Sequence, residues 1–195
     1  MLAEIIRRVG PNRFGQRSGG SHLDALVRSI VSQQLSTSAA STIHSRLLTL
    51  VGVPNPLPEH WLALDDPDLR AAGLSRQKIA YIRDLARHVQ DGELPMETLH
   101  EMTDDEVIEA LTRVKGIGVW TAQMFLMFRL GRLDILPVLD LGIRNALRRA
   151  YKLRKDPTPK RMQALAKSWA PYRSVASWYL WQSLELRPLE QPSGR

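Results

Sequence analysis

Apolar residues recur at helical spacing along most of this chain, and residues typical of helix ends separate the apolar stretches. The segment Leu23–Gln33 carries apolar side chains three and four positions apart. Ser36 is placed to cap the next helix, which is predicted to end at Gly52. No stretch of strand length alternates between apolar and polar residues. The pattern therefore predicts an all-α protein of about ten short helices.

Capping signals predict further helices in the second part of the chain. Thr103 and Glu106 form a capping box, which predicts a helix from there to Val114. A tight turn over 115–118 follows. The stretch 119–130 is almost entirely apolar, which predicts a helix that is buried on most faces. The other predicted helix starts are Asp66, Ser75, Asp140, Thr158 and Pro171.

The composition limits the chemistry that the chain can carry. Its 195 residues are enough for one domain, or for two small lobes, with a buried core. The absence of cysteine excludes a disulfide framework, a cysteine nucleophile, a thiolate zinc site and a Cys-ligated iron–sulfur cluster. The net charge of +7 favours an anionic partner, most simply nucleic acid, although a solvated cationic surface would have the same charge.

Hydropathy gives no sign of a membrane or secretory segment. No apolar run approaches the ~18 residues that a membrane-spanning helix needs. The first residues are amphipathic, and no secretory signal follows them. We therefore expect a cytoplasmic protein, located with the chromosomal DNA and without a membrane partner.

The segment from Val114 to Thr121 carries the clearest functional signal. Gly116 and Gly118 flank Ile117 between two predicted helices, and glycine lets a backbone turn tightly and approach another molecule closely. The N–H groups that begin the second helix are suited to binding a phosphate oxygen. The turn of an ordinary helical hairpin would have the same features, so the glycines alone leave both interpretations open.

Several motifs together resemble the helix-hairpin-helix DNA glycosylase superfamily, and in particular its 3-methyladenine DNA glycosylase II family. They are Val114-Lys115-Gly116-Ile117-Gly118 with Thr121-Ala122, Pro137 and Asp140, the stretch Ile30-Val31-Ser32-Gln33-Gln34-Leu35-Ser36, Gly73-Leu74-Ser75 with Lys78, and Pro171-Tyr172-Arg173-Ser174. The resemblance covers most of the chain. One departure is Lys115, because the hairpin of the superfamily usually has proline there.

The resemblance implies two small helical lobes that flank a DNA-binding cleft, without an amino-terminal β lobe. We expect one glycosylase domain over 1–187. Its central lobe would span about 36–130, and its second lobe would combine the N-terminal helices with 131–187. Residues 188–195 are expected to form a disordered tail.

Asp140 is the candidate catalytic residue. From residue type alone it is a typical N-cap of the helix that follows. The resemblance assigns it the position of the superfamily's catalytic aspartate, and one residue can serve both roles. A fixed carboxylate stabilises the positive charge that develops on the sugar as an N-glycosidic bond breaks, and it can orient or deprotonate the attacking water. An alkylated purine is already cationic and leaves without a strong general acid; Asp134 is the nearest candidate for one.

Trp120 bears on the type of product. It occupies the position at which strand-cleaving members of the superfamily carry a lysine that forms a Schiff base. Tryptophan cannot form an imine, so a monofunctional enzyme is expected. The resemblance also places Trp120 and Tyr172 in the pocket that stacks on an extruded base. Trp178 and Trp181 recur at helical spacing and are more typical of a core.

The resemblance also implies DNA contacts. Gln33, Gln34 and Leu35 match the segment that inserts into the DNA stack, with Gln34 or Leu35 as the wedge; a simple turn between two helices would explain this segment equally well. The full set of implied DNA-binding residues is Gln33, Gln34, Leu35, Lys115, Gly116, Gly118, Val119 and Thr121. The main-chain carbonyls implied to hold a structural Na+ or K+ are those of Thr112, Val114 and Ile117. No cofactor is expected to be required.

The expected activity is excision of alkylated purines, of the 3-methyladenine and 7-methylguanine type, from double-stranded DNA. It would proceed by base flipping and hydrolysis, as a step of base excision repair, in a monomeric enzyme. Two alternatives stay open: a glycosylase for another lesion (1-methyladenine, ethenoadenine or hypoxanthine), and a protein that binds damaged DNA without catalysis. Pure binding would need neither Asp140 nor aromatic residues at the pocket positions.

Overall fold

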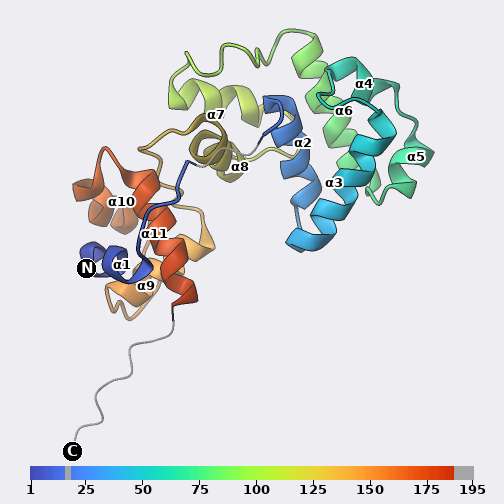
Figure 1. The fold of residues 1–195 in the computed structure, drawn as a ribbon. Helices are drawn as coiled ribbons and strands as arrows, with labels where there is room; N and C mark the ends of the chain where they lie inside the picture. Colours follow the sequence, from blue (N-terminus) through green and yellow to red (C-terminus); the bar gives the residue numbers. More distant parts are fainter. Residues whose placement is uncertain (16–18, 187–195) are drawn as a thin grey trace, which may run out of the picture. The chain divides into compact units, whose positions relative to one another are not determined.

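The computed structural model describes residues 1–15 and 19–186 of the chain. Every regular element within these ranges is a helix, which confirms the predicted all-α fold (Figure 1). The chain divides into two units. We call residues 17–130 the central unit and residues 1–16 with 131–195 the discontinuous unit.

The central unit contains most of the helices. In chain order they are α2 (His22–Ser32), α3 (Thr37–Val51), α4 (Pro58–Ala63), α5 (Asp66–Ala71), α6 (Arg76–Gln90), α7 (Asp104–Thr112), α8 (Val119–Phe125) and the π-helix η1 (Leu126–Leu130). Helices α2, α4 and α5 pack on α6, α3 packs on α2, and α7 packs on α8 (Figure 1). The buried face of α6 includes Ile79, Ile82 and Leu85, so this helix forms the centre of the unit.

The central unit covers residues 17–130 and includes α2, whereas the central lobe expected from the resemblance spans about 36–130. The reason is α2, whose buried side chains Leu26, Val27 and Ile30 face a helix pair, α3 and α6, within the central unit. The expected tail at 188–195 lies outside the described residues.

The stretch 119–130 also differs from its prediction, because its last part is a π-helix instead of regular α-helix. Within this π-helix, Arg129 donates from Nε to Nδ1 of His22 at 2.8 Å and from its terminal nitrogen to the carbonyl of Gly20. These contacts tie the widened turn to the start of α2. A run of apolar residues cannot distinguish a π-turn from an α-turn, because both bury apolar side chains.

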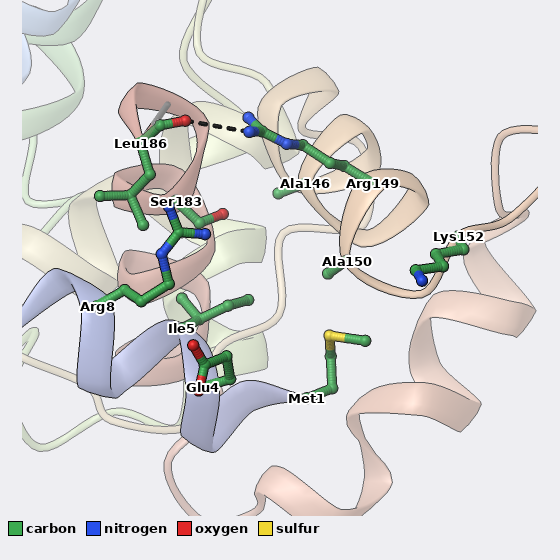
Figure 2. A pocket seen from close by; sticks show the side chains of 10 residues that line it. All are labelled: Met1, Glu4, Ile5, Arg8, Ala146, Arg149, Ala150, Lys152, Ser183 and Leu186. Atoms are coloured by element: carbon green, nitrogen blue, oxygen red, sulfur yellow. Dashed lines mark hydrogen bonds between the residues drawn. The ribbon is translucent and has the colours of Figure 1, made fainter. Parts of the chain in front are cut away.

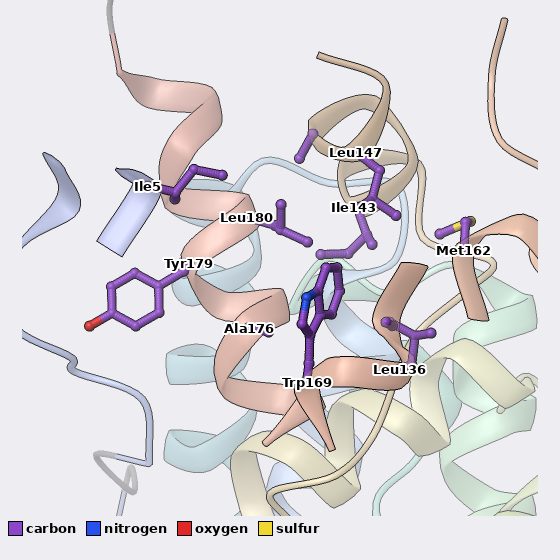
Figure 3. Packing of buried hydrophobic residues seen from close by; sticks show 11 residues of the cluster. Ile5, Leu136, Ile143, Leu147, Met162, Trp169, Ala176, Tyr179 and Leu180 are labelled. Carbon is purple, nitrogen blue, oxygen red and sulfur yellow. The ribbon is translucent and has the colours of Figure 1, made fainter. Parts of the chain in front are cut away.

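The discontinuous unit is built around its last helix. Its elements are α1 (Leu2–Val9), α9 (Leu141–Ala150), α10 (Pro159–Ala166), the 3-10 helix η2 (Lys167–Trp169) and α11 (Arg173–Glu185). Both α1 and α9 pack on α11. Figure 3 shows the shared core, in which Ile5 of α1, Ile143 of α9 and Leu180 of α11 are buried together. Among residues 1–15 and 19–186, each helix is too short or too polar to cross a membrane.

Candidate functional site

The hairpin predicted from the sequence joins α7 to α8 in the central unit. Thr103 caps α7: its Oγ1 accepts the N–H of Glu106 at 3.3 Å, and Glu106 Oε2 accepts the N–H of Thr103 at 2.7 Å. After α7 the chain turns, and the N–H of Ile117 donates to the carbonyl of Val114 at 3.1 Å. The Ile117 side chain is buried, so it anchors the turn in the interior.

Gly116 is required by the shape of this turn. Its φ is +83°, a left-handed conformation that glycine adopts readily. A Cβ built on Gly116 would also lie 2.2 Å from Cδ2 of Tyr81, which is far closer than two carbon atoms can approach. The Tyr81 ring therefore packs directly on the glycine backbone. Both facts exclude any larger residue without a shift of the hairpin.

The first turn of α8 presents backbone donors. Its N-cap is Gly118, with extended φ and ψ, and no side chain caps the turn. A Cβ at Gly118 would meet no atom within 4 Å, so the space beside this backbone is open. N–H groups in the first turn of a helix have no acceptor inside that helix and carry part of its positive dipole. Val119 and Trp120 are 43% and 44% exposed, whereas Thr121 is buried. The turn can therefore receive an anionic oxygen between apolar side chains.

Lys115 is connected to α6. Its N–H donates to Oδ2 of Asp84 at 2.8 Å, and its ammonium lies 3.0 Å from Oδ1 of the same carboxylate. Burial alone would raise the pKa of Asp84, but the backbone and side-chain contacts with Lys115 outweigh it, and the pKa lies below its usual value. The carboxylate is therefore ionised and restrains the hairpin. The Lys115 side chain stays 74% exposed, so the predicted phosphate contact remains compatible with this pair.

The turn at 33–35, between α2 and α3, is linked to the hairpin. Nε2 of Gln33 donates to the carbonyl of Gly116 at 2.7 Å. The Lys78 ammonium donates to the carbonyls of Val31 and Gln33 at 2.7 and 2.6 Å, and burial lowers its pKa. Lys78, Tyr81 and Asp84 follow one another at intervals of three on α6, so one face of this helix supports both segments.

The tip of the same turn is exposed and strained. Gln34 has a φ of +59°, which costs a non-glycine residue about 1 kcal/mol or more. Leu35 beside it is 40% exposed. An exposed apolar side chain on a supported turn suits the predicted wedge. That role, like the other predicted DNA contacts, stays a prediction.

The hairpin also contains the three carbonyl groups for which the sequence predicts a monovalent cation. Thr112 is the last residue of α7, and Val114 and Ile117 lie in the turn before α8. Carbonyl oxygens are suitable ligands for Na+ or K+. The carbonyl oxygen of Val114 already accepts the N–H of Ile117, but it has a second lone pair that can bind a cation. The donor set therefore fits such an ion, whose binding stays a prediction.

Asp140 lies in the discontinuous unit at the start of α9. As predicted, it is the N-cap: its Oδ1 accepts the N–H of Ile143 at 2.7 Å. The same oxygen accepts the indole N–H of Trp181, on α11, at 2.8 Å. Two apolar neighbours, Leu139 and Leu141, are 55% and 62% exposed. A half-buried carboxylate in a fixed orientation thus lies within an exposed apolar rim.

Asp134 has a different role from the one considered for it. Its two carboxylate oxygens accept Nε and a terminal nitrogen of Arg173 at 2.7 and 2.8 Å. These hydrogen bonds lower the pKa of Asp134 despite its partial burial. A carboxyl group that is strongly stabilised as an anion is a poor proton donor, so Asp134 is unsuited as a general acid. It instead fixes the loop before α9 to the start of α11.

The predicted pocket aromatics lie in different units. Trp120 belongs to the central unit, whereas Tyr172 is the N-cap of α11 in the discontinuous unit and is 56% exposed. A ring with that much exposed surface can stack on a planar ligand. Trp181 is partly buried and packs against the core of its unit, and residue types alone gave no reason to pair it with Asp140, 41 positions away.

Cavities are present in both units. One, of about 530 Å³, lies in the discontinuous unit between α1, α9 and α11 (Figure 2), and none of the predicted site residues lines it. A smaller cavity of about 140 Å³ in the central unit is lined by Thr121 of α8, together with Met124 and Phe128. Met124 and Phe128 belong to the apolar stretch 119–130, whose pattern gives no sign that their side chains line a cavity.

Comparisons with known proteins test the resemblance that the sequence motifs indicated. A model described as "HhH-GPD superfamily base excision DNA repair protein" matches residues 27–171. The chain is 37% identical over 168 residues to YfjP of Bacillus subtilis; the match covers 83% of this chain and 58% of that relative. The chain therefore spans little more than half the length of this relative.

Two solved structures are similar over nearly the whole chain. A DNA-3-methyladenine glycosidase from Bacillus halodurans is 41% identical, with a TM-score of 0.83, and covers 93% of this chain and 83% of its own. A 3-methyladenine DNA glycosylase of Schizosaccharomyces pombe, in complex with abasic DNA, is 34% identical and has a TM-score of 0.83. The match covers 94% of this chain and 91% of that glycosylase. These matches confirm the resemblance first inferred from the hairpin and Asp140, and this chain belongs to the HhH-GPD superfamily of base excision DNA repair proteins.

Proposed function

We propose that this protein is a monofunctional DNA glycosylase that removes alkylated purines from double-stranded DNA. The observation that carries the proposal is the environment of Asp140, a carboxylate fixed by two N–H donors at the position of the superfamily's catalytic aspartate. The similar solved structures from Bacillus halodurans and Schizosaccharomyces pombe are both named as 3-methyladenine enzymes, which supports 3-methyladenine as a substrate class.

Hydrolysis of the glycosidic bond needs a negative charge close to the sugar. As the bond between C1′ and the purine nitrogen breaks, its electron pair passes to the base, and positive charge develops on the deoxyribose. The Asp140 carboxylate stabilises that charge only as it forms, which lowers the barrier. Water adds through oxygen to C1′, and its proton passes to the carboxylate. An alkylated purine enters the reaction as a cation and leaves neutral, so the step requires no proton donor on the base.

The central unit supplies DNA contacts in this proposal. The N–H groups around Gly118 and Val119 bind a backbone phosphate, and such a contact positions DNA without reading its sequence. Leu35 or Gln34 fills the gap that the extruded base leaves in the stack. Tyr172, in the same unit as Asp140, stacks on the extruded base, and a cationic base gains about 0.5–2 kcal/mol from such a ring.

The product in this proposal is an abasic site on an intact strand. Trp120 stands where a lysine would form a Schiff base, and an indole cannot do so. Treatment with borohydride should therefore trap no covalent complex between protein and DNA. Lys115 is the nearest amine in the hairpin, and its ammonium is paired with Asp84. A trapped adduct would contradict the monofunctional assignment.

The test compares Asp140→Asn with the native protein on duplex DNA treated with a methylating agent. Asparagine keeps a side-chain oxygen that can accept the N–H groups of Ile143 and Trp181, so the cap and the fold should survive. Released bases are identified by mass, and strand breaks are measured before and after alkali. We expect base release to fall at least about 100-fold, with DNA affinity retained.

Asp156→Asn is the matched control, because Asp156 lies on the same unit and pairs with Arg148 at the surface. It should release bases at the native rate. Native activity in Asp140→Asn would contradict the assignment. Release of only 1-methyladenine from this DNA, or release of ethenoadenine or hypoxanthine only from separate duplexes that contain those lesions, would change the substrate class. Binding without any release by the native protein would leave a damage-binding function.

A further inference from the structure

The carboxylate of Asp140 is oriented by a residue from another helix. Its Oδ1 accepts one hydrogen bond from within α9, the N–H of Ile143 at 2.7 Å, and one from α11, the indole Nε1–H of Trp181 at 2.8 Å. Two donors that converge on one oxygen fix the rotation of the carboxylate about its Cβ–Cγ bond. A helix cap alone requires only the first of them.

The approach of Trp181 depends on Gly142. A Cβ built on Gly142 would lie 2.9 Å from Cδ1 of Trp181, 3.0 Å from its Nε1 and 3.0 Å from Oδ1 of Asp140. These separations are shorter than ordinary van der Waals contacts. The ring of Trp181 therefore lies directly on the first turn of α9, at a position where only glycine leaves enough space.

The helix packing supports the same hydrogen bond. Leu180 precedes Trp181 on α11 and is buried, as is Ile143, the residue that supplies the other donor (Figure 3). Both belong to one hydrophobic core, so the distance between α9 and α11 is set by packing rather than by the hydrogen bond itself. The bond is thus built into a rigid part of the unit, as a preorganised charge requires.

We propose that Trp181 is a positioning residue for the Asp140 carboxylate and that Gly142 admits it; this inference rests on the proposed function. The indole N–H is a donor only and does not lose its proton in the physiological range, so Trp181 takes no part in proton transfer. It acts by holding the carboxylate in the orientation in which its charge stabilises the sugar. A hydrogen bond to a charged group is also stronger than one between neutral groups.

The first experiment is Trp181→Phe, which keeps an aromatic ring on α11 but removes the donor. Base release is measured in single turnover, and DNA affinity is measured separately on a duplex with an abasic site. We expect the release rate to fall by about 10- to 100-fold, the size expected for a lost hydrogen bond to a charged group. Affinity should change less than about twofold, because the carboxylate acts on the reaction and not on binding.

The pattern over substrates separates positioning from contact with the base. If Trp181 acts through Asp140, release of 3-methyladenine and 7-methylguanine should fall by the same factor. If Trp181 lines the base pocket, the two rates should fall by different factors. Trp178→Phe is the matched control: Trp178 lies one turn earlier on α11 and packs edge-on against Tyr179. This control should leave the release rate within about twofold of native.

A spectroscopic measurement tests the link without any change at Trp181. The chain has five tryptophans and therefore five indole N–H signals in a proton–nitrogen NMR spectrum. In Asp140→Asn the acceptor becomes a neutral amide, so the Trp181 signal should move more than the other four. This measurement also covers the case in which Trp181→Phe fails to fold, and Gly142→Ala offers a second variant that displaces the ring.

The outcomes are separable. If Asp140→Asn releases bases at the native rate, the proposed function fails. If Asp140→Asn is inactive while folded Trp181→Phe keeps the native rate, or if the Trp181 signal does not move in Asp140→Asn, only the positioning role is refuted. Equal losses of release rate and DNA affinity in Trp181→Phe would also refute it, since they indicate a structural role alone.

Discussion

Replacement of Gly116 by alanine should be among the most damaging single changes in the hairpin. Two costs add at this position. A left-handed conformation costs a residue with a Cβ about 1–2 kcal/mol. The new methyl group would lie 2.2 Å from Cδ2 and 2.6 Å from Cγ of Tyr81. These are atoms at the base of the ring, so a simple swing of the side chain cannot clear them, and such overpacking costs about 1–3 kcal/mol.

The expected destabilisation is therefore about 2–5 kcal/mol, a large part of the total stability of an ordinary domain. Thermal unfolding followed by far-UV circular dichroism should show a melting temperature lower by about 4–20 °C. DNA affinity, measured by fluorescence anisotropy, should also fall, because the turn that presents the N–H groups of α8 must shift.

Gly118→Ala is the matched control, two residues away in the same turn. Its φ is −96°, and a Cβ there would meet no atom within 4 Å. The loss should stay below about 1 kcal/mol, the range for a poorer N-cap. In a Gly116→Ala and Tyr81→Ala double variant, the overpacking part should disappear while the backbone part persists. If Gly116→Ala melts at the same temperature as Gly118→Ala, the steric reasoning is wrong.

Other predictions concern the ionised residues that support the two units. Lys78→Met should destabilise the protein by about 1–3 kcal/mol and weaken DNA binding, because two backbone carbonyls lose their donor. Lys160→Met, at an exposed site, is the control in thermal unfolding and in DNA binding. Equal effects of the two substitutions would contradict the role of Lys78. The pKa of Asp134 is lowered by Arg173, so its ion pair stabilises fully above the ordinary carboxyl pKa and is lost as the pH falls through the folded-state value. Below about pH 4, native stability should therefore fall more steeply than that of Asp134→Asn, and parallel unfolding curves would refute this.

Local capping chemistry explains why most of the fold could be predicted from the sequence. Ser36, Ser75, Thr103, Asp140 and Thr158 were all expected to begin helices, and each accepts the N–H of the residue three positions later. Such contacts are decided within four residues and need no knowledge of the tertiary structure. The π-turn of η1 and the place of α2 in the central unit depend on distant partners, and both were missed for that reason.

The candidate site divides in the same way. The backbone turn at Gly116 and the cap at Asp140 are local features, and the sequence located both. The contacts that fix them in place are not local: Asp84 reaches Lys115 across 31 positions, and Gln33 reaches Gly116 across 83. Residue types alone give no reason to pair a particular aspartate, lysine or glutamine at such separations. The supporting residues were therefore visible only in the folded chain.

The contact between Trp181 and Asp140 is also distant in the sequence, yet it leaves a local trace. Gly142 lies in the first turn of α9, where glycine is about 1 kcal/mol less favourable than alanine for a helix. It is neither the N-cap nor the C-cap of the helix, and its φ is not positive. An unfavourable glycine inside a helix indicates that something passes close to the backbone, and here that neighbour is the indole of Trp181. A glycine two residues after a capping aspartate thus marks a site where a second helix can place a donor on the carboxylate. Gly142→Ala tests this interpretation directly. If the close approach serves Asp140, the rate of base release should fall even though alanine has the higher helix propensity. If the close approach only packs two helices, the rate of base release should stay at the native value.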